Sequence, residues 1–172
     1  MDVAGYREYV AVQLDPLRRT AYLLCGDWHT ADDLVSTALI KLFRRWKRVS
    51  QMENIDAYAR RVLFRAWLDE RRRPWRRERF TDTMPEPGGT GPVTETSVVD
   101  RLALAAYLAE LPPRRRAVLV LRYFCDLSVE DTAEVLGCST GTVKSQTARA
   151  LDTLRERMLA AVTASPVTSR RH

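Results

Sequence analysis

Residue types that catalysis and metal binding depend on are scarce in this chain of 172 residues. It has two histidines, three cysteines and seven glycines, and one histidine is the last residue. Cys25, Cys125 and Cys138 are an odd number without CxxC spacing, so we expect free, mostly buried thiols and no metal site. Without a glycine-rich phosphate loop or a cluster of catalytic groups, we predict no catalytic residues, no cofactor and no enzyme activity.

Long apolar runs and strand patterns are missing as well. No run approaches the roughly 20 residues that cross a membrane, and no signal peptide opens the chain, so we expect a cytoplasmic protein without a membrane span. Apolar residues recur at helical rather than period-two spacing, which predicts an all-α fold. The 28 Lys and Arg outnumber the 22 Asp and Glu, for a formal charge of +6, and this excess favours a polyanionic partner such as nucleic acid.

Charge and composition divide the chain into two small helical domains. Residues 80–99 contain three acidic and no basic residues and are rich in Pro, Gly and Thr. This composition predicts a flexible acidic linker. We therefore expect helical domains at 1–79 and 100–165, with 166–172 as a tail.

Residues 126–154 carry the clearest local pattern, two short helices around a tight turn. Ser128 and Asp131 form a capping box for the first helix, Gly137 is a typical C-terminal stop, and Ser139 caps the second helix. We expect an inward face formed by Val129, Ala133, Leu136, Val143, Thr147, Ala150 and Leu154. The outward face of the second helix then holds Gly141, Lys144, Ser145, Ala148 and Arg149. This pattern is typical of a helix-turn-helix that enters the major groove; an ordinary αα-hairpin in a helical core is the alternative.

The first 50 residues predict two helices. One begins near Tyr6 and ends at Gly26, with a kink or restart at Pro16. The second is expected to begin with a capping box at Thr30 and to bury an apolar stripe. That stripe consists of Leu34, Val35, Ala38, Leu39, Leu42, Phe43 and Trp46. Ile40 lies among charged residues on the opposite face, either as a lone exposed apolar residue or as the centre of a partner contact.

A third helix is predicted from residues 54–56 to a point before Pro74. Arginines alternate with Phe64 and Trp67 on its outer side, an arrangement that suits single-stranded nucleic acid because bases stack on aromatic rings. The alternative is a helix packed on both sides with solvated arginines. Asp69, four residues after Arg65, is predicted to join a structural ion pair.

Residues 31–43 (ADDLVSTALIKLF) and 57–63 (AYARRVL) resemble conserved region 2 of bacterial sigma70-type sigma factors. Residues 111–124 (LPPRRRAVLVLRYF), which lead into the helix-turn-helix, resemble region 4. The short chain lacks regions 1 and 3, as in the extracytoplasmic-function (ECF) group. Both motifs occur in the right order, and the resemblance extends from Tyr6 to about Arg157.

The resemblance implies a protein that binds core RNA polymerase as a monomer within the holoenzyme, recognises promoter DNA and helps to open it. It also admits an anti-sigma factor as a partner, and it assigns the linker a path toward the polymerase active site. The implied polymerase-binding residues are Asp33, Leu34, Ser36, Thr37, Ile40, Lys41 and Arg44. Those implied for the melted −10 strand are Arg48, Asn54, Tyr58, Arg60, Arg61, Arg65 and Trp67. Those implied for the −35 duplex are Ser139, Thr142, Lys144, Ser145, Gln146 and Arg149, where Arg149 contacts either a base edge or a phosphate.

Two other functions fit parts of the pattern. A response-regulator-type transcription factor shares a helix-turn-helix, but it would bring an α/β phosphoacceptor domain, and residues 1–79 have no strand pattern. A basic helical RNA-binding protein fits the charge alone.

Overall fold

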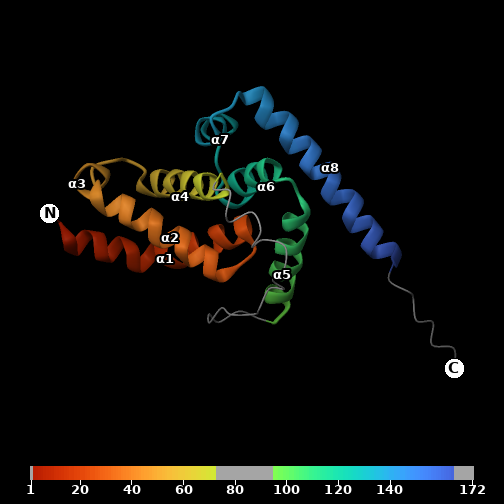
Figure 1. Ribbon diagram of the computed structural model, residues 1–172, viewed down its shortest axis with the longest axis horizontal. Helices are drawn as coiled ribbons and strands as arrows, with labels where there is room; N and C mark the ends of the chain where they lie inside the picture. Colours follow the sequence, from red (N-terminus) through yellow and green to blue (C-terminus); the bar gives the residue numbers. More distant parts are fainter. Residues whose placement is uncertain (1, 73–94, 165–172) are drawn as a thin grey trace.

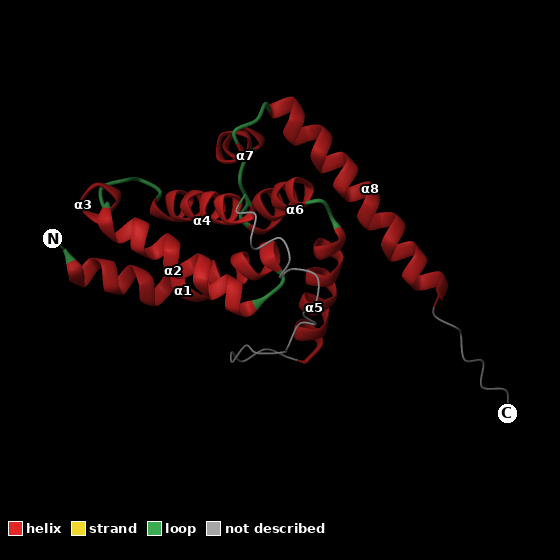
Figure 2. Ribbon diagram, viewed as in Figure 1, coloured by secondary structure: helices red, strands yellow, loops and turns green. Residues whose placement is uncertain are grey.

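A computed structural model describes residues 2–72 and 95–164, with side chains in the second range from residue 103 onward. Every regular element in these ranges is helical (Figures 1 and 2), which confirms the all-α prediction. The elements are α1 (Val3–Cys25), α2 (Trp28–Arg44), α3 (Trp46–Val49), α4 (Ile55–Arg71), α5 (Glu95–Glu110), α6 (Pro113–Leu119), a π-helical turn (Val120–Phe124), α7 (Val129–Leu136) and α8 (Thr140–Ala164). We refer to 2–72 as the N-terminal lobe and to 95–164 as the C-terminal lobe.

The first two helices meet at a sharp turn whose capping differs from the prediction. Helix α1 continues through Pro16 without a restart, and Gly26 ends it in the left-handed conformation, at φ 76°. Asp27, rather than Thr30, is the N-cap of α2. Its carboxylate accepts hydrogen bonds from the backbone N–H and the hydroxyl of Thr30, both at 2.7 Å. The left-handed conformation of Gly26 turns the chain sharply, so α2 begins directly after it. The carboxylate of the next residue, Asp27, is therefore placed to cap α2.

The apolar stripe predicted for α2 packs against α1 and α4. Leu34, Val35 and Leu42 are buried, and the Tyr6 hydroxyl of α1 donates to the Leu39 carbonyl at 2.9 Å. Burial of this stripe leaves the opposite side of α2 toward solvent, because an amphipathic helix buries one face only.

Helix α4 is buried on two sides, which corrects one prediction from the sequence. Phe64 and Trp67 are 0% and 1% exposed, so these rings lie in the core and are not available to stack on bases. The alternative of a helix packed on both sides is therefore the observed one. Asp69 does form an ion pair, but its partner is Lys41 of α2, at 4.0 Å, rather than Arg65.

The C-terminal lobe contains the predicted helix-turn-helix as α7 and α8. The Ser128 hydroxyl accepts from the Asp131 N–H at 2.9 Å, Gly137 ends α7 at φ 63°, and the Ser139 hydroxyl accepts from the Thr142 N–H at 3.1 Å. Helix α5 precedes this unit and begins at Glu95, inside the stretch predicted as linker. The remainder of that predicted linker, up to residue 94, and the predicted tail lie outside the described residues.

The two lobes share one hydrophobic core. Buried residues of the N-terminal lobe, such as Leu24 and Trp67, belong to the same cluster as Leu108 and Leu121 of the C-terminal lobe. Helix α1 packs against α5 and α6, while α4 packs against α7. Figure 1 shows α7 lying over the junction of α4 and α6, with the end of α8 projecting from the body.

Candidate nucleic-acid interface

The outer face of α2 is a polar surface with one large apolar residue. Ile40 is 54% exposed, and the side chains around it on this face are also exposed: Asp33, Ser36, Thr37, Lys41 and Arg44. Leu34, assigned to the same set by resemblance, is only 3% exposed. It therefore supports this face from the core and cannot lie on its surface.

The segment between α3 and α4 presents several of the residues implied for the −10 strand. Arg48 and Asn54 are exposed, and Tyr58 is half-buried. The Asn54 side-chain oxygen accepts from the Ala57 N–H at 2.9 Å and so caps α4. This cap fixes the position of the Asn54 side chain, whose amide N–H groups can donate to an outside partner.

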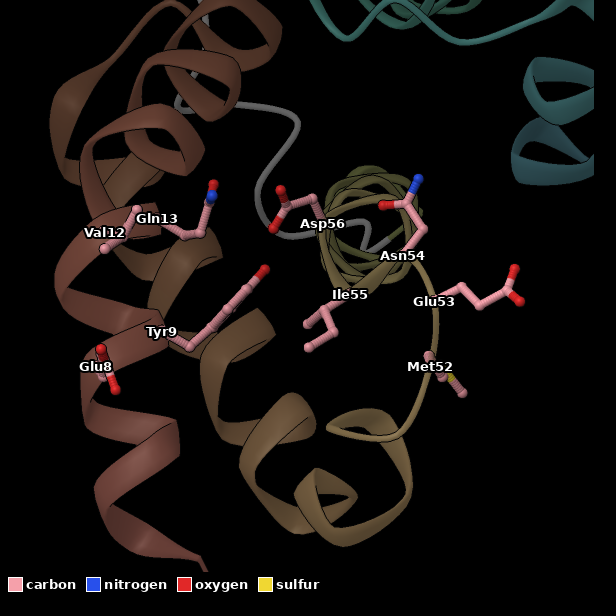
Figure 3. A pocket seen from close by; sticks show the side chains of 9 residues that line it. All are labelled: Glu8, Tyr9, Val12, Gln13, Met52, Glu53, Asn54, Ile55 and Asp56. Carbon is pink, nitrogen blue, oxygen red and sulfur yellow. The ribbon is translucent and has the colours of Figure 1, made fainter.

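A pocket of about 380 Å³ lies beside this segment. Helix α1 contributes Glu8, Tyr9, Val12 and Gln13, and the remaining wall comes from residues 52–56. Figure 3 shows the Tyr9 ring reaching from α1 toward Ile55 and Asp56 at the start of α4. Burial first, and then the nearby Asp56 carboxylate, raise the pKa of the Tyr9 hydroxyl, so this group stays a neutral donor. The contribution of α1 to this pocket could not be predicted from the sequence, because Tyr9 is indistinguishable in pattern from Tyr6, which packs against the core.

The three arginines implied for the −10 strand on α4 have different surroundings. Arg65 is exposed, whereas Arg60 and Arg61 are half-buried. Arg60 Nη1 donates to the Cys125 carbonyl at 3.4 Å, and Arg61 Nη1 lies 2.6 Å from Glu134 Oε1. Both acceptors belong to the C-terminal lobe. Trp67, from the same implied set, is buried in the core and cannot contact a strand.

The outer side of α8 offers two long cations and several short side chains. Lys144, Ser145 and Arg149 are exposed. Ser139 and Thr142 bond to each other at the cap, with 2.9 Å between their hydroxyl oxygens, and Gln146 is half-buried. Because short groups lie between the cations, a double helix can approach this face closely and meet positive charge on both sides.

The cysteines are buried or half-buried free thiols. Burial raises the pKa of Cys25 to about 12 and also raises the pKa of Cys125, so neither thiol forms a thiolate readily at neutral pH. Among the described residues, no three His, Cys, Asp or Glu side chains are grouped in a way that could hold a metal ion. In the same ranges, no helix has the length and apolar character needed to cross a membrane.

Two family models match this chain. "Sigma-70 region 2" matches residues 11–77 and "Sigma-70, region 4" matches residues 101–154. The RNA polymerase sigma-E factor of Streptomyces coelicolor is 37% identical over 161 residues, which cover 92% of this chain and 89% of the relative. The ECF RNA polymerase sigma factor SigL of Mycobacterium tuberculosis is 34% identical over 158 residues, with 88% and 85% covered.

Solved structures agree on the fold. The sigma factor RpoE, in complex with the anti-sigma factor NepR from Bartonella quintana, superposes with a TM-score of 0.67 at 23% identity, covering 90% of this chain and 96% of the other. CnrH, in complex with the cytosolic domain of CnrY, gives a TM-score of 0.61 at 18% identity, with 91% and 89% covered. The matched regions and the curated relatives, taken with the helix-turn-helix and the polar faces, establish that this chain belongs to the sigma-70 family as an ECF sigma factor, a non-catalytic subunit that directs RNA polymerase in transcription initiation.

Proposed function

We propose that this sigma factor uses three separate surfaces, one for core RNA polymerase and two for promoter DNA. The outer face of α2, centred on Ile40, binds core RNA polymerase. The segment from Arg48 to Tyr58 and the arginines of α4 hold the melted −10 strand. The outer side of α8 contacts the −35 duplex. One observation carries the assignment of α2: Ile40 is a large apolar side chain exposed at the centre of a polar face, opposite the side that holds the buried residues of this helix.

The pocket beside residues 52–56 suits an unstacked base of the −10 element. A base pushed out of the helix exposes hydrogen-bonding edges that pairing hides. Three carboxylates, those of Glu8, Glu53 and Asp56, lie in the lining. They can accept hydrogen bonds from exocyclic amino groups, whereas they repel phosphate, so the pocket favours a base over the backbone.

The −35 contact on α8 is mainly to the DNA backbone. Lys144 and Arg149 supply charge, while Gly141, Ser145 and Ala148 are too short to reach far into the groove. This combination favours phosphate contacts and shape recognition over direct base reading.

The partners of this chain follow from the same surfaces. They are core polymerase, in which the chain acts as a single copy in the cytoplasm, and promoter DNA. An anti-sigma factor is a further partner, because the structural relative RpoE is bound to the anti-sigma factor NepR.

The test of the α2 assignment is Ile40→Glu, with Leu159→Glu on α8 as the matched control. Both residues are exposed, at 54% and 66%, so neither substitution disturbs the core. Placing an unpaired carboxylate in an apolar contact should weaken core polymerase binding at least about tenfold, equivalent to about 1.4 kcal/mol. Leu159→Glu should bind like the parent in fluorescence anisotropy titrations with core polymerase. Equal affinity of the two variants would show that α2 does not bind through this face.

A further inference from the structure

A second cavity, of about 530 Å³, lies beside the first half of α4. It shares only Asn54 with the pocket beside residues 52–56. Its volume lies within the range of roughly 300 to 1,000 Å³ that is usual for small-molecule sites. Helix α4 contributes two arginines, and the loop before α7 and α7 itself contribute carboxylates and apolar groups; these residues are Arg60, Arg61, Asp126, Leu127, Asp131 and Val135.

The two walls of this cavity carry opposite charge. Arg60 and Arg61, on the α4 wall, are half-buried, whereas Asp126 and Asp131, on the other wall, are exposed. A simple anion in the cavity would be repelled by the carboxylates, and a simple cation would be repelled by the arginines. A molecule with a negative charge at one end and a positive charge at the other is therefore complementary to both walls.

Both walls have polar groups without a partner among the described residues. Arg61 Nη1 pairs with Glu134 at 2.6 Å, but Arg61 Nε is buried and has no hydrogen-bond partner in that part of the chain. On the opposite wall, Asp131 Oδ2 accepts from the Ser128 hydroxyl at 2.8 Å. The Asp126 carboxylate has no such partner within the described ranges. Each wall therefore offers at least one group that a ligand could satisfy.

The backbone of Asp126 has an uncommon conformation. Its φ is 52°, and no other non-glycine residue in the described ranges has a positive φ. Asp and Asn tolerate this left-handed region better than other residues with a side chain. Such conformations are concentrated at binding sites, where the surrounding structure holds them in place. The residue with this conformation is also the one whose carboxylate is free at the cavity wall.

We propose that this cavity binds a zwitterionic small molecule of the size of an amino acid or a dipeptide. The arginines hold its carboxylate, because guanidinium groups match the geometry of that group. Its ammonium group pairs with Asp126, and its apolar part packs against Leu127 and Val135. Arg60 and Arg61 are also proposed contacts of the −10 strand, so the site is tested on the free full-length chain without DNA.

The probe is the dipeptide glycyl-leucine, titrated into the ¹⁵N-labelled chain and followed by NMR. We expect saturable shifts of the backbone amides of residues 125–127, with a dissociation constant below about 1 mM. N-acetylglycyl-leucine lacks the ammonium group and glycyl-leucinamide lacks the carboxylate. Each analogue should bind about two- to fivefold more weakly, the range for loss of one partly exposed ion pair. The proposal is wrong if no shift saturates by about 10 mM or if both analogues bind like glycyl-leucine.

The variant that tests the ammonium contact is Asp126→Asn, which keeps a side chain suited to the left-handed backbone. Its matched control is Glu130→Gln, an exposed acid of α7 outside the cavity lining. Asp126→Asn should weaken glycyl-leucine binding about two- to fivefold and leave the affinity for N-acetylglycyl-leucine unchanged, because that analogue has no ammonium group. Equal losses for both peptides, or affinities equal to those of Glu130→Gln, would overturn the assignment. These titrations contain neither polymerase nor DNA, so their failure leaves the proposed function untouched.

Discussion

Val143 is the residue through which the start of α8 is fixed to the rest of the C-terminal lobe. It is 0% exposed and packs in a small cluster with Val118 of α6 and Ala133 of α7. Few apolar contacts hold the first turn of α8, which also carries Lys144, in position. Truncation of Val143 should therefore lower the stability of the protein substantially.

The magnitude for Val143→Ala follows from two contributions. Losing two buried methyl groups removes about 1.6 kcal/mol, at about 0.8 kcal/mol each. A residual cavity of up to about 40 Å³ adds up to about 1 kcal/mol, at about 24 cal/mol per Å³. The free energy of unfolding should therefore fall by about 1.6 to 2.6 kcal/mol.

The assay is urea unfolding followed by circular dichroism, with Val162→Ala as the matched control. Val162 lies on the same helix but is 73% exposed, so this identical truncation should change the free energy of unfolding by less than about 0.5 kcal/mol. We expect Val143→Ala holoenzyme to lose −35-dependent transcription at a lower temperature than the parent. If both truncations cost the same, the small cluster would not be what positions α8.

The other predictions concern charge. Arg149→Ala should lower the slope of log affinity against log salt concentration for the −35 duplex by about 1 and leave base preferences unchanged. The control Arg155→Ala, on the same helix, should keep the slope of the parent. A changed preference at one base pair would show that Arg149 reads a base. Replacing residues 80–97 with a neutral Gly/Ser segment of equal length should keep promoter binding but alter the pattern of abortive transcripts, and unchanged initiation kinetics would identify a passive tether. Burial would raise the pKa of the Asp27 carboxyl, but hydrogen bonds from Thr30 outweigh burial and lower that pKa. The resulting stabilisation is present above the unfolded pKa near 4 and is lost as the pH falls through the folded pKa. Between pH 5 and 2, the free energy of unfolding should therefore fall less for Asp27→Asn than for the parent.

Local signals in the sequence predicted the helices well because their causes are local. A cap, a stop and an apolar stripe lie within a few residues of one another, and this was enough to predict α7, α8 and the inner face of α2. The predicted start of α2 was three residues too late, because Asp27 and Thr30 are both good caps. Only the left-handed conformation of Gly26, which the sequence permits but does not require, decides between them.

Contacts between the lobes could not be predicted in the same way. The sequence places Phe64 and Trp67 on the outer side of α4. In the structure both rings are buried in a cluster that also contains Leu108 and Leu121 of the C-terminal lobe. Residues so distant in the sequence take part in this core, and no periodicity within α4 reports them.

Arginine shows most clearly how environment, rather than residue type, decides a role in this chain. Arg114 and Arg116 are neighbours in one basic run, yet Arg114 is exposed and Arg116 is buried. The signal that separates them is helical phase, because Arg116 lies three and four residues before the buried Leu119 and Val120. A charge on the core side of a helix must find acceptors there, and the nearest ones are the carbonyl ends of two other helices, one from each lobe. The Leu24 carbonyl at the end of α1 accepts from Arg116 at 2.6 Å, and the carbonyls of Ala109 and Leu111 accept at 2.8 and 3.2 Å. Satisfying this one charge therefore also joins the two lobes.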